Sequence, residues 1–398
     1  MSIIEKRKQI KKNRILQIIR DNENVSRYDV KKITKYSMTT VLSSVNALIE
    51  EGLVFEEESS EIKIGRTPQF LKINPNGRYF IGVEFNADIL NVVVTNFDAE
   101  LIYKNNYKID RNQPVTQLIN RVKAGIQKAI DLVPDKEKVV GIGLGIPGYV
   151  DKVNGLALEY SYLKGFNNLP IKDLIKEDFS YDVVMDNNIN ALTNEYKWVN
   201  KLKKDFIIVS MQYGTRLGIV LDNKIFTGTK GNAGEIGHTR VLNGTRKCSC
   251  GKVGCLDTEI SHLAIEQKIM EQIQEGRFAS VKGMLERANG KFSISMFSEA
   301  LENNDADAKK MLKDISVTLG GKLATVISVL NIKNIIILDV CNLDNENFPR
   351  YVYETIKDYS LETLTKNMKV EAEIIDQYAG AKGAAIMVLD KHFGKVKE

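Results

Sequence analysis

The sequence has no hydrophobic run long enough to cross a membrane. No eighteen consecutive apolar residues occur among its 398 residues, so we expect no transmembrane helix. The segment Met1–Lys12 is charged from Glu5 onward and lacks an apolar core, so we expect no secretory signal. With 43% hydrophobic and 27% charged residues, the composition is that of a globular protein. These features exclude membrane, collagen-like and disordered classes and predict a cytoplasmic protein of two or three domains.

The chain also has little net charge, and that charge is unevenly placed. The formal net charge is +5, whereas residues 1–36 alone carry eleven Lys or Arg and four acidic residues, a balance of +7. The remainder therefore sums to −2. A basic end on a nearly neutral body favours contact of that end with a polyanion, although a solvated helix face explains the charge equally well.

Cysteine is scarce, and three of the four cysteines fall within eight residues. Cys248, Cys250 and Cys255 form this cluster, while Cys341 stands apart. Clustering of this kind is typical of a metal site in a cytosolic protein rather than of a disulfide framework. The alternative is a set of reduced thiols beside an incidental histidine. We expect Cys341 to be a small, buried, apolar residue.

Residues 1–77 predict a small helical domain followed by a linker. Isoleucines recurring on one face indicate a first helix, Ser26 caps a second, and Ser37 caps a third that ends at Gly52. Three short helices followed by a two-stranded wing form the winged helix-turn-helix arrangement. A helical interaction domain that binds no DNA is the alternative.

The wing and the third helix supply the expected DNA contacts. Residues 53–55 and 62–64 are predicted to pair as the hairpin of the wing. Small or flexible side chains at the start of the third helix suit base edges in the major groove, and an arginine beside the wing suits a narrow minor groove. The predicted DNA-binding residues are Ser37, Met38, Thr39, Thr40, Ser43 and Arg66.

After residue 78 the pattern changes to that of an α/β fold. Three strands, a helix, a strand and a helix follow in order, and a similar strand-rich order restarts at Phe206. This is the ribonuclease-H-like order, so we predict two similar lobes with a cleft between them. The predicted domains are residues 1–77, lobe 1 at residues 78–190 with the C-terminal helix 378–398, and lobe 2 with the metal loop at residues 191–377. Further helices are expected within residues 257–284, 293–303 and 306–330.

Two adjoining motifs resemble the ROK family, named for repressors, open reading frames and sugar kinases. Residues 231–238 read Gly-Asn-Ala-Gly-Glu-Ile-Gly-His, and residues 248–257 read Cys-Ser-Cys-Gly-Lys-Val-Gly-Cys-Leu-Asp. The family patterns are Gly-Glu-x-Gly-His and Cys-x-Cys-Gly-x-x-Gly-Cys-x-Glu. The Gly-Arg-Thr-Pro stretch at residues 65–68 is similar to the wing signature of the family's repressor branch. The resemblance covers nearly the whole chain.

The resemblance implies a metal site and a sugar site. Three thiolates and one imidazole complete the tetrahedral shell of a structural Zn²⁺, with the ligands His238, Cys248, Cys250 and Cys255. The hydroxyls of a monosaccharide would be held at the positions that match the family's sugar-binding residues: Asn187, Asn188, Glu235, His238 and Asp257. An ordinary solvated loop is the alternative for these polar residues. Asp257 is one methylene shorter than the family's Glu.

Residues that the family's kinases use are missing here. Asn188 replaces the catalytic Asp, and an amide cannot take the proton from a sugar hydroxyl. The first phosphate loop, Asp-x-Gly-Gly-Thr in kinases, is Glu-Phe-Asn-Ala-Asp at residues 84–88 and has no glycine for close approach of a phosphate. The second loop at residues 214–219 and the expected Gly-Gly turn near residues 337–341 differ as well. We therefore expect no catalytic residues and no phosphoryl transfer.

These features together predict a sugar-responsive transcriptional repressor of carbohydrate genes. Its expected partners are operator DNA, a monosaccharide effector and a second copy of the chain, as a homodimer or a dimer of dimers. An ATP-dependent sugar kinase with an accessory DNA-binding domain is one alternative. A constitutive DNA-binding protein that has lost sugar binding is another.

Overall fold

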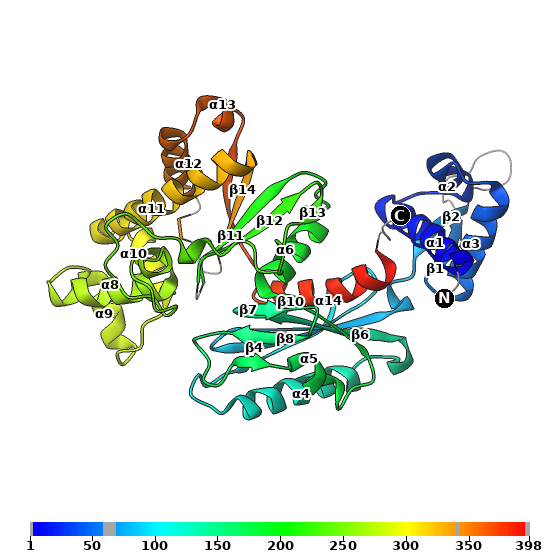
Figure 1. The fold of residues 1–398 in the computed structure, drawn as a ribbon, viewed down its shortest axis with the longest axis horizontal. Helices are drawn as coiled ribbons and strands as arrows, with labels where there is room; N and C mark the ends of the chain where they lie inside the picture. The colour runs from blue at the N-terminus through cyan, green and yellow to red at the C-terminus, as the bar shows by residue number, and fades with distance from the viewer. Residues whose placement is uncertain (1–2, 59–68, 213, 340–342, 345, 395–398) are drawn as a thin grey trace.

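A small N-terminal head stands beside a larger body of two lobes in the computed structural model (Figure 1). The structure describes residues 3–58, 69–212, 214–339, 343–344 and 346–394. The last helix runs back toward the head, where the amide of Asn13 donates to the carbonyl oxygens of His392 and Gly394 at 3.2 and 3.3 Å. The C-terminal helix of the body therefore contacts the first helix of the head.

The head begins with three helices whose ends are set by short polar side chains. Ser26 Oγ accepts from the Asp29 amide at 3.2 Å, while Asp29 accepts from the Ser26 amide at 3.1 Å, which forms a capping box. Ser37 Oγ accepts from the Thr40 amide at 3.2 Å, and Gly52 adopts a φ of +69° after the third helix. The predicted boundaries are confirmed by the helices α1 (Ile3–Asp21), α2 (Arg27–Thr34) and α3 (Met38–Glu50).

The described part of the head also contains a two-stranded sheet. β1 (Val54–Glu58) pairs antiparallel with β2 (Gln69–Ile73), so that Val54 lies opposite Ile73. We expected residues 62–64 as the partner, and these lie outside the described residues, as does Arg66. The pairing follows from burial, because Leu71 is fully buried in the hydrophobic core of the head.

Lobe 1 is built on a five-stranded sheet in the order β10-β6-β3-β4-β5. Strands β3, β4 and β5 form an antiparallel meander. β6 then pairs parallel with β3, and β10 pairs parallel with β6. The strands are β3 (Tyr79–Phe85), β4 (Ile89–Thr95), β5 (Leu101–Lys108), β6 (Val139–Ile146) and β10 (Asp182–Asn187). The remaining elements of this part of the chain are η1 (Pro75–Gly77), α4 (Val115–Asp131), η2 (Lys136–Lys138), a small sheet of β7 (Tyr149–Asp151), β8 (Leu156–Glu159) and β9 (Asn167–Leu169), α5 (Ile171–Lys176) and α6 (Asn188–Val199).

The C-terminal helix α14 (Ala379–Phe393) returns to cover the sheet of lobe 1. Glycine makes this close packing possible, because a Cβ at Gly82 or Gly143 would collide with the backbone of α14 at Ala381 or Ala384. The helix packs beside α6, and it runs from between the lobes toward the head (Figure 1). The end of the chain is thus part of the layer that supports the cleft.

Lobe 2 repeats the sheet of lobe 1, in the order β13-β12-β11-β14-β15, with three antiparallel strands followed by two parallel ones. This repetition confirms the predicted two-lobed α/β fold. The strands are β11 (Phe206–Ser210), β12 (Arg216–Leu221), β13 (Lys224–Ile225), β14 (Asn334–Asp339) and β15 (Lys369–Ile374). The helices are η3 (Ile236–His238), α7 (Asp257–Ile260), α8 (His262–Gln274), α9 (Ala279–Arg287), α10 (Ile294–Glu302), α11 (Ala306–Leu330), α12 (Asn347–Tyr359) and α13 (Glu362–Thr365).

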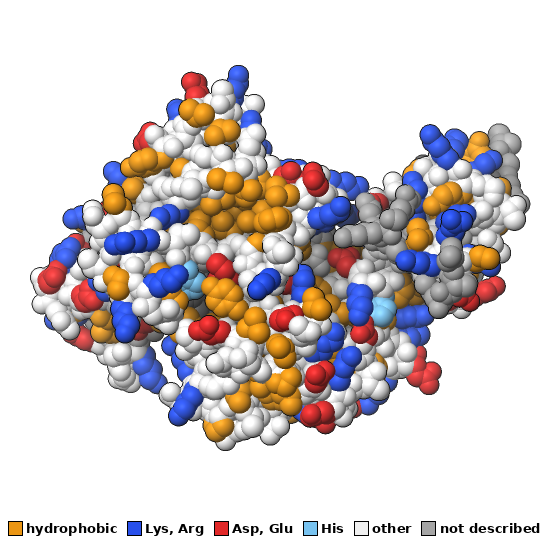
Figure 2. All heavy atoms as spheres, in the orientation of Figure 1, with side chains coloured by type: hydrophobic (Ala, Val, Ile, Leu, Met, Phe, Trp, Pro, Cys, Tyr) orange, Lys and Arg blue, Asp and Glu red, His pale blue; other side chains and the backbone are white. Residues whose placement is uncertain are grey.

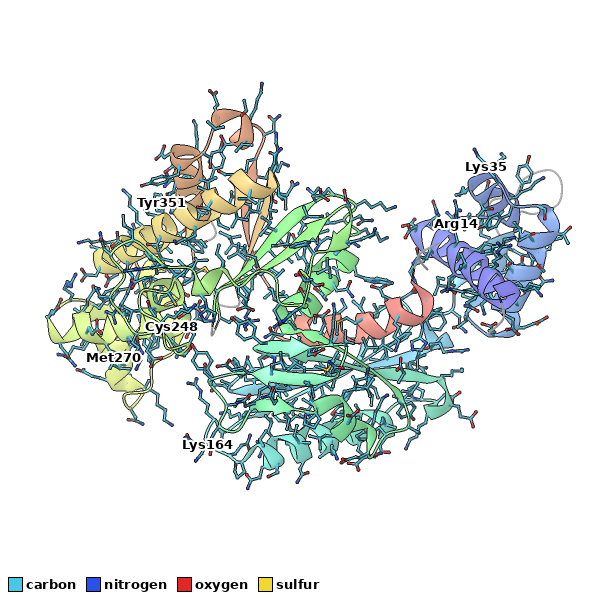
Figure 3. All side chains as sticks on the ribbon, in the orientation of Figure 1. Arg14, Lys35, Lys164, Cys248, Met270 and Tyr351 are labelled. Atoms are coloured by element: carbon cyan, nitrogen blue, oxygen red, sulfur yellow. The ribbon has the colours of Figure 1, made fainter. Side chains whose placement is uncertain are left out.

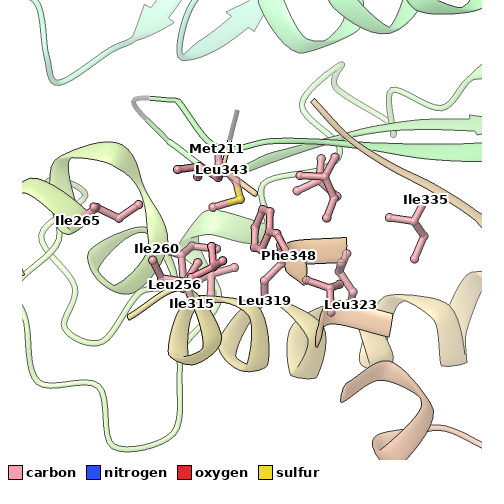
Figure 4. Close-up of a cluster of buried hydrophobic side chains, with 14 of the residues drawn as sticks. Met211, Leu256, Ile260, Ile265, Ile315, Leu319, Leu323, Ile335, Leu343 and Phe348 are labelled. Atoms are coloured by element: carbon pink, nitrogen blue, oxygen red, sulfur yellow. The ribbon is translucent and has the colours of Figure 1, made fainter. Parts of the chain in front are cut away.

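The segment 257–284 contains three helices with breaks between them. Ser261 ends α7 and caps α8 by accepting from the Ala264 amide at 3.3 Å. Gly276, at a φ of +83°, separates α8 from α9. The helices bury their apolar sides against the sheet in a large core that includes Leu256, Ile260, Ile265, Leu319 and Phe348 (Figure 4). Within the described ranges, no helix is long and apolar enough to cross a membrane.

Candidate functional site

A cleft of about 970 Å³ opens between the two lobes. Lobe 1 lines it with residues that follow β3 and β6, among them Asp88 and Gly148. Lobe 2 lines it with Arg216, His238 and Asp257. The first turn of α6 adds the side chain of Asn188. The cleft therefore lies where the carboxyl ends of parallel strands meet, which is the usual place for a ligand in an open α/β sheet.

The four predicted metal ligands come together on the lobe 2 side of this cleft. The ligand atoms of His238, Cys248, Cys250 and Cys255 all lie within 4.8 Å of one another. The Sγ atoms of Cys250 and Cys255 are 3.6 Å apart, and Cys248 Sγ is 3.7 Å from His238 Nδ1. The loop turns back at Gly251, which has a φ of +85°. Figure 3 marks Cys248 within lobe 2. This cluster could hold a metal ion.

His238 also faces the cleft and its acidic neighbour. Its Nδ1 atom lies 3.9 Å from Asp257 Oδ2. The other carboxylate oxygen, Oδ1, accepts from the Thr215 amide at 2.6 Å. Burial raises the pKa of Asp257, and the bond from Thr215 and the charge of His238 oppose this rise. The metal cluster and the predicted sugar-binding residues thus share one side chain.

Arg216 is a cleft residue whose role the sequence did not reveal. It lies 2.7 Å from Glu235 Oε1 in an ion pair, and it donates to the carbonyl oxygen of Gly148 in lobe 1 at 3.2 Å. Burial raises the pKa of Glu235 to about 7, although Arg216 lowers it. The sequence did hold one indication of its importance, because Arg216 stands in a loop where the family's kinases have glycine. Arg216 therefore bridges the lobes and covers Glu235, which is absent from the described residues that line the cleft.

The two adjacent asparagines at the start of α6 face different ways. Asn187 is buried, accepts from the Ile189 amide at 3.0 Å as the cap of α6, and donates to the carbonyl oxygen of Gly148. Asn188 lines the cleft. Of the five predicted sugar-binding residues, the structure therefore places Asn188, His238 and Asp257 on the wall of the cleft and Asn187 beneath its floor.

Glu84, at the end of β3, is a second cleft residue whose role the sequence did not reveal. The sequence showed only that it belongs to a stretch that differs from the phosphate loop of the family's kinases. Its side chain is buried and accepts from Asn91 Nδ2 at 3.3 Å, and it is also hydrogen-bonded to Asn188. Burial raises the pKa of Glu84 to about 7, while these two amides lower it. A few residues further on, Asp88 forms two hydrogen bonds to Arg111, at 2.7 and 2.8 Å. Carboxylates thus stand at both ends of residues 84–88, the stretch expected from the resemblance to match the first phosphate loop of the family's kinases.

The five predicted DNA-contact residues that the structure describes lie on the outside of the head. Ser37, Met38, Thr39 and Ser43 are exposed, and Thr40 is half-buried. Lys and Arg side chains gather on the visible face of the head (Figure 2), and Figure 3 marks Arg14 and Lys35 there. The first turn of α3 therefore presents short polar side chains beside a basic surface.

Not all eleven cations counted in residues 1–36 belong to that surface. Lys12 pairs with Glu51 at 2.7 Å, and Arg27 pairs with Glu56 at 2.6 Å. Arg20 lies inward, with its guanidinium over the ring of Phe97. The charge available to a polyanion is consequently smaller than the +7 counted from the sequence.

The fold and this site define a class of protein, namely a two-lobed body of the sugar-kinase type that carries a helix-turn-helix head. The chain belongs to the ROK family, whose family model matches residues 80–391. It is 29% identical over 388 residues to the xylose repressor of Caldicellulosiruptor bescii, and the match covers 96% of each chain.

Two solved structures of the family have the same fold. One, titled as a ROK family transcriptional regulator that is a homolog of the E. coli MLC protein, has a TM-score of 0.84 and 23% identity and covers 98% of this chain and 97% of its own. The other, a ROK family glucokinase from Streptomyces griseus in complex with glucose and AMPPNP, has a TM-score of 0.66 and 21% identity. The glucokinase covers 78% of this chain and 98% of its own.

Proposed function

We propose that this protein is a sugar-responsive transcriptional repressor of carbohydrate uptake or catabolism genes. One observation carries the proposal: a helix-turn-helix head and a sugar-kinase-type body occupy one chain, and that chain matches a xylose repressor over 96% of both lengths. The glucokinase, in contrast, leaves about a fifth of this chain unmatched. A repressor works on the chromosome, so the proposal places the protein in the cytoplasm.

The head is proposed to bind DNA as a winged helix-turn-helix. The first two turns of α3 enter the major groove, so that Met38, Thr39 and Ser43 reach base edges. Lysines of α1 and α2 contact phosphates and position the head without specifying sequence. Two heads of a homodimer would bind half-sites about one helical turn, or a multiple of it, apart. Arg66 is assigned to the minor groove from the sequence alone.

The metal in the cluster is proposed to be a structural Zn²⁺. Tetrahedral zinc with bonds of about 2.3 Å separates its sulfur ligands by roughly 3.8 Å, close to the 3.6 Å between Cys250 and Cys255. Burial and the two neighbouring thiols raise the pKa of Cys255 to about 12 in the protein without metal. Three thiolates in so small a space therefore need a cation, which a bound zinc would supply while it fixes the loop.

A monosaccharide is proposed to bind in the cleft against Asn188, His238 and Asp257. Amide and carboxylate groups accept and donate in pairs, which suits neighbouring hydroxyls. Asn187 contributes by capping α6 and holding Asn188 in place, and Glu235 by fixing Arg216. A ligand that binds the folded protein at one hundred times its Kd adds about 2.7 kcal/mol of stability. A thermal shift with one member of a monosaccharide panel is therefore expected, and its absence with every member would favour a constitutive DNA-binding protein.

Phosphoryl transfer is proposed to be absent. Asn188 cannot act as a general base, and its hydrogen bond to Glu84 places a carboxyl group where phosphates would need cations or backbone amides. The competing function is an ATP-dependent sugar kinase with an extra head. An assay of ADP release with hexoses and pentoses distinguishes the two, and robust turnover would contradict the proposal.

A further inference from the structure

Arg20, in the last turn of α1, lies at the junction of the head and the body. Its Nη2 donates to the carbonyl oxygen of Phe97 at 3.0 Å. The guanidinium carbon is 4.7 Å from the centre of the Phe97 ring and 5.1 Å from that of Trp198. Its Nε and Nη1 atoms are buried without a hydrogen-bond partner. A cation of the head is therefore held between two rings of the body, with most of its donors unused.

Buried guanidinium N–H groups without a hydrogen-bond partner are unusual, because each lost hydrogen bond to water is uncompensated. Three carboxylates, of Asp21, Asp98 and Asp390, are close enough to act on Arg20 electrostatically. Arg20 nevertheless forms no ion pair with them within the described ranges. Asp390 belongs to α14 and is hydrogen-bonded to Asn194 of α6. A carboxylate that attracts the Arg20 guanidinium thus belongs to a different element of the body.

The two helices that surround Arg20 both begin at the cleft. α6 starts with Asn188 on the cleft wall and ends beside Arg20 with Trp198 in its last turn. α14 starts beside Glu84, against which Gly380 packs, and Gln377 just before it accepts from Asn91 at 2.8 Å. Each helix therefore spans the distance between the candidate sugar site and the head.

The two helices are also fastened to each other. A Cβ at Gly383 would collide with the carbonyl of Ala191, so their backbones touch. Lys382 of α14 forms an ion pair with Glu195 of α6 at 3.3 Å. At the head end, the ring of Phe393 packs against that of Phe97 with centres 4.9 Å apart. Close backbone packing and the ion pair therefore hold α6 and α14 together along their length.

We propose that Arg20 is a positioning residue that couples the cleft to the head. When sugar shifts α6 and α14, the Arg20 guanidinium exchanges the Phe97 carbonyl for the Asp390 carboxylate, and α1 changes its orientation on the body. The inference rests on the proposed function and names the element through which it is regulated. It needs two arrangements of the junction with different affinities for sugar, which is the physical requirement for allostery.

The coupling is measured with the full-length protein, a duplex selected by the wild type from random-sequence DNA, and D-xylose, D-glucose and N-acetylglucosamine as sugar probes. The ratio of DNA Kd with sugar to DNA Kd without sugar is the readout. We expect it to differ from one by about fivefold or more in the wild type, the usual range of allosteric coupling. In Arg20→Met this ratio of Kd values is expected to lie within about twofold of one. Arg20→Lys is expected to keep part of the wild-type change in DNA affinity.

The matched control is Lys203→Met. Lys203 pairs with Asp21 at 3.4 Å across the same junction, but its side chain is 72% exposed, so we expect the coupling ratio of the wild type to be retained. Asp390→Asn, which keeps the size of the side chain and removes its charge, is expected to reduce coupling as Arg20→Met does. This second variant tests the inference even if Arg20→Met fails to fold.

The outcomes separate the inference from the proposed function. If the wild type responds to a sugar and both Arg20→Met and Asp390→Asn respond equally, the inference is wrong and the proposed function stands. If the wild type binds no DNA, or binds it equally with every sugar, the proposed function is wrong and the inference falls with it. If Lys203→Met loses coupling as fully as Arg20→Met, a specific role for Arg20 is contradicted.

Discussion

His238 Nδ1 lies 3.7 Å from Cys248 Sγ and 3.9 Å from Asp257 Oδ2, so one ring edge faces both the candidate metal cluster and the candidate sugar-binding cleft. The metal would therefore act on the ligand site through the orientation of this imidazole, as the groups around a metal commonly do. Two members of the cluster, His238 and Cys250, line the cleft, so loss of the proposed metal is expected to affect both the stability of the protein and ligand binding in the cleft.

Removing one cysteine of the cluster is expected to lower both the stability of the protein and its binding of sugar. Cys250→Ser replaces a thiolate ligand by a hydroxyl, so we expect loss of bound zinc, a fall in Tm and a smaller thermal shift with sugar. Metal content by mass spectrometry and thermal unfolding check this. Cys341→Ser, which is outside the four-residue cluster, is the control and is expected to keep its zinc. A Cys250→Ser protein that retains zinc and Tm would contradict the assignment.

Restoring the general base is not expected to restore a kinase. Asn188→Asp places a second carboxyl group against Glu84, whose pKa is already about 7, and two carboxyl groups so placed compete for one proton. The phosphate loops remain without their glycines. We expect no ADP release above that of the wild type and a lower Tm at pH 8. Sugar-dependent ADP release by this variant would show that the loops can still hold ATP.

The buried carboxyl of Glu84 predicts a specific dependence of stability on pH. Its pKa rises from 4.5 to about 7 on folding, so the folded state holds the proton more tightly than the unfolded chain. This contribution is complete below about pH 4.5 and is lost as the pH rises through about 7, a difference of about 3 kcal/mol at most.

Glu84→Gln removes that titration and keeps a hydrogen-bonding side chain. Between pH 5 and pH 8, its free energy of unfolding is therefore expected to fall less than that of the wild type, as measured by urea unfolding at both pH values. Glu137→Gln, at an exposed position, is the control and is expected to follow the wild type. An equal fall in the free energy of unfolding of Glu84→Gln and the wild type between pH 5 and pH 8 would contradict the raised pKa of Glu84.

Two substitutions in the head distinguish base contacts from phosphate contacts. Met38→Ala removes a side chain at the start of α3 and is expected to change affinity for the selected site by about 1–3 kcal/mol while leaving non-specific binding unchanged. Lys31→Ala on α2 is expected to weaken binding to all sequences and to reduce the slope of log Kd against log salt by about one. Fluorescence anisotropy at several salt concentrations measures both. The opposite assignment of effects would contradict the proposed docking of α3.

Local sequence was sufficient to predict the parts of the fold that depend on local hydrogen bonds. Ser26 and Ser37 cap helices as expected because a cap needs only the next three residues. The four predicted metal ligands come together because all of them lie within residues 238–255, a short stretch of chain that contains several glycines. The two lobes were predictable from the repeated order of strands.

The remaining features depend on contacts between distant residues. Arg216 was noticed only as a change in a loop, because its partner Glu235 and the Gly148 carbonyl come from other segments. Asn187 and Asn188 are the same residue type, so the sequence could not tell their roles apart. Because α6 begins between them, Asn187 is buried as its cap and Asn188 faces the cleft. The charge count likewise could not show that Arg20 is covered by the body.

The central claim is tested most directly by the affinity of the full-length protein for a DNA duplex selected from a random library, measured with and without each sugar of a monosaccharide panel. The account predicts sequence-specific binding and a change in Kd of about fivefold or more with at least one sugar. Equal Kd values with every sugar, together with sugar-dependent release of ADP from ATP, would contradict it.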